Sequence, residues 1–212
     1  DPIGGGVDFQ MVGTNEIDTV IMVGDSITVA STPQLEEMFE RFGFDSVFIE
    51  SKQGKRIALS FGSNPSGVEV AEDLIKKMHA AGDTRVEGAA EDLFDHSNEL
   101  WVVALGTNDI GQYSGPGESA TAVDEMLQAV PDESPLVWVD TFFRDRPDAT
   151  AELNVIIRNL VSQRDLSVIA SWSAVADDDG NLRNDGGHPR EQGSIVFANV
   201  TGNAIADFLQ LT

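Results

Sequence analysis

The segment TVIMVGDS, residues 19–26, indicates both the fold and the place of the functional site. Its first five residues are apolar or β-branched, Gly24 ends the run, and Asp25 and Ser26 follow directly. A short run that is apolar throughout is typical of a strand buried on both faces of a parallel sheet. Polar residues directly after such a strand lie at the carboxyl edge of the sheet, where α/β proteins bind their ligands.

Further runs of the same kind alternate with segments of helical periodicity. The apolar runs are residues 46–49, 100–105, 136–139 and 166–170. One helix is expected behind Thr32-Pro33, with apolar residues at 35, 38, 39 and 42 and a stop at Gly43. The same spacing recurs over 71–78, 123–130 and 153–160, and a last helix is expected from about Pro189 to Leu209. The alternation predicts a three-layer α/β/α sandwich around a parallel sheet of five strands.

Composition excludes several classes of function. Asp and Glu number 36 against 13 Lys and Arg, so the formal net charge is −23. Such a chain repels nucleic acid, and its charge predicts that neutral or cationic substrates are turned over faster than anionic ones at low salt. The absence of cysteine excludes disulfides and thiolate chemistry. No ligand cluster suggests a metal or a cofactor, and no apolar run is long enough for a membrane span.

The length of 212 residues fits one domain. Residues 1–18 begin with a proline and a glycine triplet and are expected to be a linker or N-terminal extension, and 19–212 the folded domain. The start carries neither Met nor a basic leader, which suggests a processed or excised piece with further sequence upstream. An extracytoplasmic or secreted location is expected on that interpretation.

Three polar runs fall where the predicted fold places chemistry. They are Gly24-Asp25-Ser26, residues 106–109 (GTND) and residues 185–189 (DGGHP). Together they hold a serine, an amide, an aspartate and a histidine, which is the inventory of a nucleophile, its base, an orienting carboxylate and an oxyanion donor. Asp185 lies three residues before His188, so a turn can return its carboxylate to the imidazole.

Four ordered blocks, residues 23–28, 52–55, 105–109 and 185–189, resemble those of the SGNH hydrolases, which include the GDSL esterases and lipases. The resemblance implies a flavodoxin-like fold, Ser26 as nucleophile, His188 as general base and Asp185 as its partner. It also implies an oxyanion hole made of the Ser26 and Gly54 backbone N–H groups and the Asn108 side chain. The second block is short, so Gly62 and Gly67 remain alternatives to Gly54.

The function expected from this resemblance is a serine esterase acting on short-chain acyl esters, chiefly acetyl esters of carbohydrate. The spacing of the blocks is also similar to that of SGNH domains attached to membrane O-acyltransferases, which leaves acyl transfer to a cell-surface glycan, with a membrane part upstream, as an alternative. A non-catalytic flavodoxin-like binding module is the third interpretation. The loop after the first strand lacks a phosphate cradle rich in Ser, Thr and Gly, which argues against FMN.

Four other residues receive lesser expectations. Arg144 follows the fourth strand and is a candidate to bind a substrate carboxylate or sugar hydroxyl, with a surface salt bridge as the alternative. Asp109 is expected to support the site structurally. His79 and His96 are expected at the surface, because one ends a helix and the other lies in a polar stretch.

Overall fold

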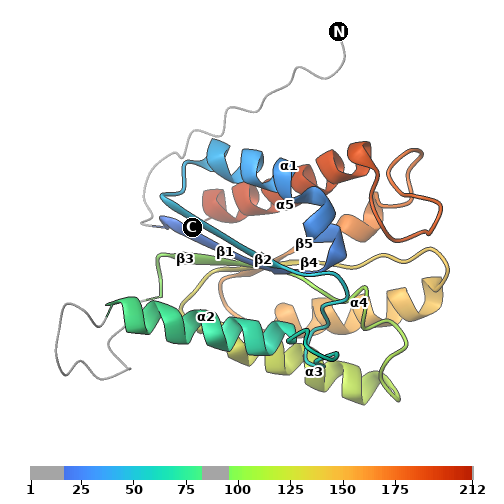
Figure 1. Cartoon of the computed structure of the whole chain (residues 1–212), viewed down its shortest axis with the longest axis horizontal. Coiled ribbons are helices and arrows are strands. Elements are labelled where there is room, and N and C mark those ends of the chain that lie inside the picture. The colour runs from blue at the N-terminus through green and yellow to red at the C-terminus, as the bar shows by residue number, and fades with distance from the viewer. Residues whose placement is uncertain (1–16, 83–95, 212) are drawn as a thin grey trace, which may run out of the picture.

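The computed structural model describes residues 17–82 and 96–211. Five parallel strands form one sheet in the order β2-β1-β3-β4-β5, and helices cover both faces (Figure 1). The strands are β1 (Thr19–Gly24), β2 (Ser46–Ser51), β3 (Glu99–Ala104), β4 (Leu136–Val139) and β5 (Ser167–Ala170). The predicted α/β/α sandwich with five parallel strands is therefore confirmed.

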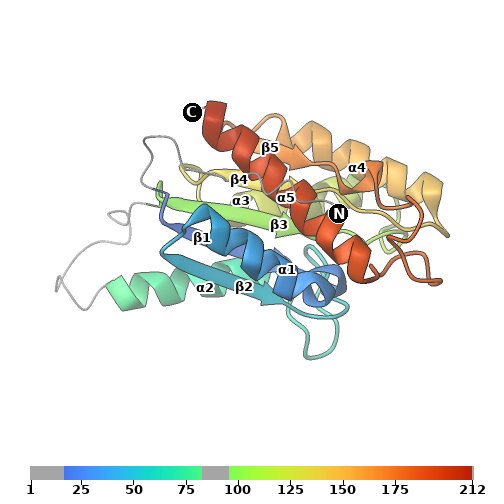
Figure 2. The ribbon, with the colours of Figure 1, turned by 90° about the horizontal axis from the view of Figure 1, so that it is seen from above.

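The helices divide between the two faces of the sheet (Figures 1 and 2). They are α1 (Ser26–Phe42), α2 (Gly67–Gly82), α3 (Pro116–Ala129), α4 (Pro147–Val161) and α5 (Glu191–Leu211). Helices α1 and α5 pack together on one face, whereas α2, α3 and α4 lie on the other. The last helix begins two residues after the predicted start, because Pro189 pairs with Leu182 in an isolated bridge.

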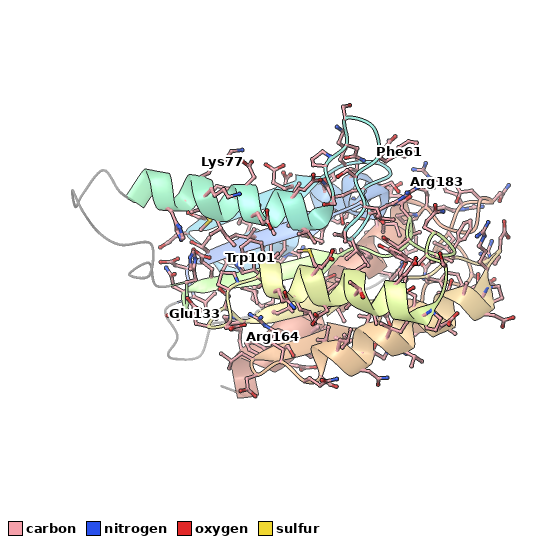
Figure 3. The ribbon with its side chains drawn as sticks, turned by 90° about the horizontal axis from the view of Figure 1, so that it is seen from below. Phe61, Lys77, Trp101, Glu133, Arg164 and Arg183 are labelled. Atoms are coloured by element: carbon pink, nitrogen blue, oxygen red, sulfur yellow. The ribbon has the colours of Figure 1, made fainter. Side chains whose placement is uncertain are left out.

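Alternate residues of the strands build a separate core on each face. Val20 and Met22 of β1 face α1 and α5, whereas Ile21 and Val23 face the other three helices. Trp101 of β3 is fully buried between the sheet and those helices (Figure 3). Strands apolar on both faces thus bind the two helical layers to one sheet, as expected for parallel strands.

Helix α1 begins at Ser26, well before the start at Thr32-Pro33 that the sequence predicted. Asp25 caps it, with its Oδ1 accepting the backbone N–H of Ile27 over 2.9 Å, so the helix starts at Ser26 and carries Pro33 inside it. Pro33 lies beyond the first turn of the helix, so its missing N–H removes the hydrogen bond that this position would otherwise donate to Val29 O. Gly43 ends the helix in the left-handed conformation, as predicted.

Strand β2 departs from the expectation of full burial. It pairs only with β1 and lies at the edge of the sheet, and the side chains of Val47 and Phe48 are 38% and 47% exposed. In the described ranges no helix is long and apolar enough to cross a membrane. Most of the predicted linker, 1–18, lies outside the described residues, although Ile17 already packs into the core.

Candidate active site

Ser26 lies where β1 meets α1, at the carboxyl edge of the sheet. It occupies the first position of α1, so its backbone N–H has no partner within the helix and points out of the helix N-terminus. The turn before it needs glycine, because a Cβ on Gly24 would stand 2.0 Å from Thr28 Oγ1. The close packing of Gly24 against Thr28 therefore holds Ser26 at the sheet edge.

His188 and Asp185 lie in the loop that precedes α5, and they face Ser26. The Nε2 atom of His188 is 2.9 Å from Ser26 Oγ, and its Nδ1 atom is 3.1 Å from Asp185 Oδ2. The other carboxylate oxygen of Asp185 accepts the backbone N–H groups of Gly187 and His188. The three side chains therefore form one hydrogen-bonded chain across 162 residues of sequence.

The charge of Asp185 is stabilised by this turn. Burial alone would raise the pKa of the carboxyl, but the hydrogen bonds from the two backbone N–H groups and from His188 outweigh burial and lower it. The loop is fastened at both sides, because Arg183 N donates to His188 O over 2.8 Å and Arg144 N donates to Gly186 O over 2.9 Å. Gly186 adopts a φ of 72°, and a Cβ there would meet Arg144 at 2.8 Å.

Asn108 and Gly54 face the same edge from the loops after β3 and β2. The Asn108 amide nitrogen donates to Lys55 O over 3.1 Å and to Asp25 Oδ2 over 3.2 Å, so its nitrogen end is oriented by two oxygens. Gly54 has a φ of 74°, and the described residues offer its N–H no acceptor. Of the two alternatives, Gly67 uses its N–H on Arg56 O, and Gly62 is exposed.

Asp109 supports the site structurally, as expected. Its carboxylate accepts the N–H of Ile57 and the hydroxyl of Tyr113, which ties the loop after β2 to the loop after β3. Burial raises its pKa to about 6, against the opposing effect of those two donors. The contact fixes the backbone next to Gly54 and Asn108.

Asp25 is a site residue that the sequence analysis did not single out. It is 1% exposed, and its two oxygens bind Ile27 N and Asn108 Nδ2. Burial raises its pKa to about 7 despite the hydrogen bond from Ile27, and the charge of Asp109 adds to the increase. The signal in the sequence is its position as N-cap, directly before the helix that begins with Ser26.

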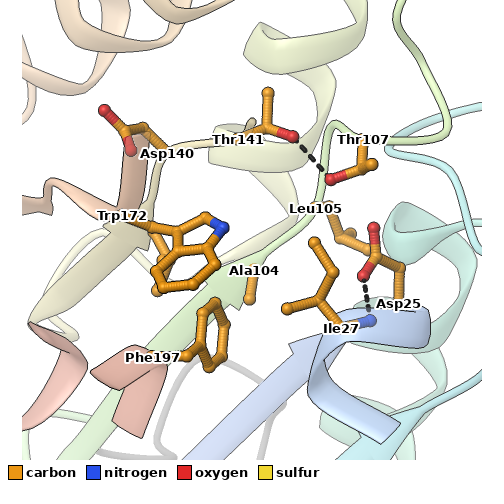
Figure 4. A pocket seen from close by; sticks show the side chains of 10 residues that line it. Asp25, Ile27, Ala104, Leu105, Thr107, Asp140, Thr141, Trp172 and Phe197 are labelled. Atoms are coloured by element: carbon orange, nitrogen blue, oxygen red, sulfur yellow. Dashed lines mark hydrogen bonds between the residues drawn. The ribbon is translucent and has the colours of Figure 1, made fainter. Parts of the chain in front are cut away.

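A small pocket lies beneath the N-terminus of helix α1, between β3, β4 and α5 (Figure 4). Its lining combines Asp25 and the hydroxyls of Thr107 and Thr141, 2.5 Å apart, with the apolar side chains of Ile27 and Phe197. Ser26 and His188 do not line it. The pocket is therefore separate from the candidate nucleophile and its histidine.

Two expectations concern residues outside the hydrogen-bonded chain of Ser26, His188 and Asp185. Arg144 forms an ion pair with Asp177, 2.6 Å from Nε to Oδ1, which is the salt bridge considered as the alternative to substrate binding. The surface position expected for His96 is wrong: the residue is 5% exposed and its Nδ1 contacts Glu99 Oε2 at 2.8 Å. His79, only partly exposed, meets the Nε2 atom of His96 at 2.9 Å.

The carboxylate of Glu99 explains why His96 is buried. Burial raises the pKa of Glu99, and the hydrogen bond and charge of His96 oppose that shift. The missed signal is the spacing of three residues between His96 and Glu99, the same as between Asp185 and His188. Within residues 17–82 and 96–211, no three His, Asp or Glu side chains are arranged to hold a metal ion.

The family can now be stated from a comparison with known proteins. A model of the GDSL-like lipase/acylhydrolase family matches residues 22–194. The chain belongs to this family. The resemblance drawn from the four blocks is thereby confirmed, and the chain is a hydrolase. Comparison with curated proteins gives no match.

Several solved structures share the fold. The family 3 carbohydrate esterase of Clostridium thermocellum has a TM-score of 0.62 at 16% identity, over 91% of this chain and 97% of that one. The C-terminal catalytic domain of peptidoglycan O-acetyltransferase A from Streptococcus pneumoniae has a TM-score of 0.58 at 15% identity, over 92% and 93%. The esterase EstA of a Pseudoalteromonas species has a TM-score of 0.56 at 12% identity, over 91% of this chain and 99% of that one. At these identities the similarity shows the fold.

Proposed function

We propose that this hydrolase is a serine esterase that removes short acyl groups, chiefly acetyl, from the hydroxyl groups of carbohydrates. The observation that carries the proposal is the hydrogen-bonded chain of Ser26, His188 and Asp185 at the edge of the sheet. The likeness in fold to a carbohydrate esterase adds support for the substrate class.

The proposed reaction begins with attack of Ser26 Oγ on the ester carbonyl carbon. His188 Nε2 takes the hydroxyl proton, while Asp185 accepts the Nδ1–H, fixes the tautomer and stabilises the imidazolium. The carbonyl oxygen becomes an oxyanion that receives the N–H groups of Ser26 and Gly54 and one N–H of Asn108. This last bond draws the amide hydrogen away from its 3.2 Å contact with Asp25.

Collapse of the tetrahedral intermediate expels the sugar alkoxide, which takes its proton from His188. The acyl group then remains as an ester on Ser26. A water molecule attacks that ester as His188 takes its proton, and a second collapse releases the carboxylic acid and returns the proton to Ser26 Oγ. Atoms balance as one ester and one water giving one alcohol and one acid.

The loops at this edge favour short acyl groups. Residues 105–115, between β3 and α3, form turns rather than a helix, and no amphipathic lid helix is found at this edge in the described ranges. An open edge buries little of a long chain, although each buried methylene would contribute about 0.8 kcal/mol. We expect kcat/KM for 4-nitrophenyl esters to be highest between two and four acyl carbons. A maximum at ten carbons or more would indicate a lipase instead.

A fluorophosphonate probe with mass spectrometry of the labelled protein tests the nucleophile. The adduct is expected on Ser26 and is expected to vanish in Ser26→Ala but not in Ser162→Ala, an exposed serine beyond α4. Labelling on another serine, or none, would contradict the proposal. Acyl transfer to a glycan, with a membrane part upstream of this chain, is the alternative, and added oligosaccharide distinguishes it: transfer yields acetylated sugar at the expense of free acetate.

A further inference from the structure

The basic side chains of the described residues divide by whether they pair with a carboxylate. Six form an ion pair within 4.0 Å: Arg41, Lys76, Lys77, Arg144, Arg158 and Arg164. The other six have no carboxylate of the described residues within that distance. They are Lys52, Lys55, Arg56, Arg146, Arg183 and Arg190. Six unpaired cations are unexpected in a chain of net charge −23, where carboxylates outnumber them severalfold.

All six unpaired cations come from segments at the carboxyl edge of the sheet, where Ser26 lies. They follow β2, follow β4 or precede α5. Figure 3 shows Arg183 and Phe61 at this end of the molecule and the paired Arg164 towards the other end. Cations that lack a carboxylate partner are thus gathered around the candidate active site and not spread over the surface.

One segment at this edge carries three basic residues and no acidic residue of its own. Residues 52–66, here called loop 52–66, contain Lys52, Lys55 and Arg56 and no Asp or Glu. The loops on the other side of the site carry acids among their arginines, as at Asp145 and Asp177. Since salt screens charges beyond about 8–10 Å, the nearest groups set the potential at a site rather than the net charge of the chain. Loop 52–66 therefore contributes positive charge at this edge, while Glu69 of α2 accepts hydrogen bonds from its Ser60 and Ser66 and Asp109 attracts the Arg56 guanidinium.

Loop 52–66 is joined directly to the proposed oxyanion hole. Lys52 N donates to Gly24 O at the end of β1, and Lys55 O accepts the Asn108 amide. Lys55 is buried and directs its Nζ to Pro65 O over 3.3 Å, with its pKa lowered by that burial, so it holds the loop together. Lys52 and Arg56 remain accessible beside Gly54.

The tip of the loop presents an aromatic ring with a guanidinium on it. Phe61 is 66% exposed, more than any other large apolar side chain in the described residues, and the Arg56 guanidinium carbon lies 5.3 Å from its ring centroid. Phe61 pairs with Asn64, which donates to Gln53 O beside Gly54. An exposed ring fits the apolar face of a sugar, and a guanidinium matches a carboxylate with two parallel hydrogen bonds.

We propose that loop 52–66 binds a carboxylate on the sugar that carries the ester, through Arg56 and Lys52, with the Phe61 ring against the sugar face. The inference rests on the proposed carbohydrate esterase function and names its substrate class as acidic carbohydrate. The inference predicts that anionic sugars are preferred over neutral ones, which is the opposite of what the net charge of the chain alone predicts. The unpaired cations are then the complement of a charged substrate.

Two acetylated methyl glycosides that differ only at C6 provide the test. The glucuronoside carries a carboxylate there and the glucoside a hydroxymethyl group, with the acetyl group on the same ring hydroxyl. At 20 mM salt we expect kcat/KM to be about five- to tenfold higher for the glucuronoside, the size expected for one or two exposed charge contacts. The preference narrows at 500 mM salt because the contacts are screened.

Variants assign the preference to the loop. Lys52→Gln is expected to reduce the ratio of the two kcat/KM values, and Lys52→Gln with Arg56→Gln to bring it near one. The double variant Lys76→Gln with Lys77→Gln removes the same charge from α2 and is expected to preserve the ratio. Phe61→Ala is expected to lower kcat/KM for both glycosides while that for 4-nitrophenyl acetate stays within twofold.

The outcomes separate this inference from the proposed function. If the enzyme hydrolyses neither glycoside and also fails to hydrolyse 4-nitrophenyl acetate, the proposed function is overturned, and the inference with it. Hydrolysis of both glycosides at equal rates, or a preference that resists salt and the loop variants, overturns the inference alone.

Discussion

The amide nitrogen of Asn108 lies 3.2 Å from Oδ2 of Asp25, the residue that precedes the candidate nucleophile. The other oxygen of the same carboxylate caps α1 through Ile27 N. One buried side chain thus joins the first turn of α1, which carries Ser26, to the loop after β3. Asp25 is therefore placed to position the proposed oxyanion donor relative to the nucleophile.

Replacing Asp25 by asparagine is expected to lower kcat through Asn108. The carbonyl of the new side chain can still cap α1, but its NH₂ group then faces the Asn108 amide, donor against donor. Asn108→Ala should cost about 10²–10³ in kcat with little change in KM, as for loss of one oxyanion donor. Asp25→Asn should cost about tenfold or more alone, but less than threefold in the Asn108→Ala background. Additive losses in this double-mutant cycle would show that Asp25 acts independently of Asn108.

The same substitution is expected to gain stability relative to the wild type as pH rises from acid to alkaline values. The folded pKa of Asp25, about 7, lies above the ordinary value of 3.8, so the folded state binds the proton more tightly than the unfolded chain. Its contribution to the free energy of unfolding therefore falls as pH rises from 3.8 through about 7. Asparagine carries no charge to bury and caps helices as well as aspartate does.

The measurement is the difference in Tm between Asp25→Asn and wild type at several pH values. We expect the difference in stability between variant and wild type to be more favourable to the variant at pH 8 than at pH 4. The expected change is at least about 1 kcal/mol, or roughly 2–4 °C in Tm. Asp124→Asn, on the exposed side of α3, is the control and should show no such trend. A difference that is constant with pH would mean that the Asp25 carboxylate is not destabilised by burial.

Ser26→Ala and His188→Ala are each expected to reduce ester turnover by about 10³-fold or more, because the two groups act as a unit. The double variant should be little worse than either single one. Thermal unfolding of each variant should stay cooperative, since neither side chain belongs to the apolar cores. Ten per cent residual activity in either single variant would remove that residue from the mechanism.

Glu99→Ala is expected to destabilise the fold by about 3–5 kcal/mol, because it leaves His96 buried without its carboxylate. Urea unfolding measures the loss, and Glu133→Ala at the surface is the matched control. The pair lies at the amino edge of the sheet, so kcat/KM should change less than twofold. A loss below 1 kcal/mol would mean that His96 is satisfied without Glu99.

The sequence by itself determined the strands, the helices and the edge at which the polar residues gather. These depend on local patterns: apolar runs for buried strands, a spacing of three and four for helices, and glycine or proline at their ends. The contact between Asp185 and His188 is also local, because a turn of three residues brings them together. For the same reason the equivalent spacing of His96 and Glu99 could have been recognised.

Only the tertiary structure decided which distant residues meet. The strand order β2-β1-β3-β4-β5 is absent from any local pattern, yet it brings the loops after β2 and β3 to either side of Ser26. The Asp25–Asn108 contact spans 83 residues and the Ser26–His188 contact 162. The burial of a side chain, the pKa of Asp25 and the lack of carboxylate partners in loop 52–66 all depend on neighbours in space. A sequence pattern records only the neighbours along the chain.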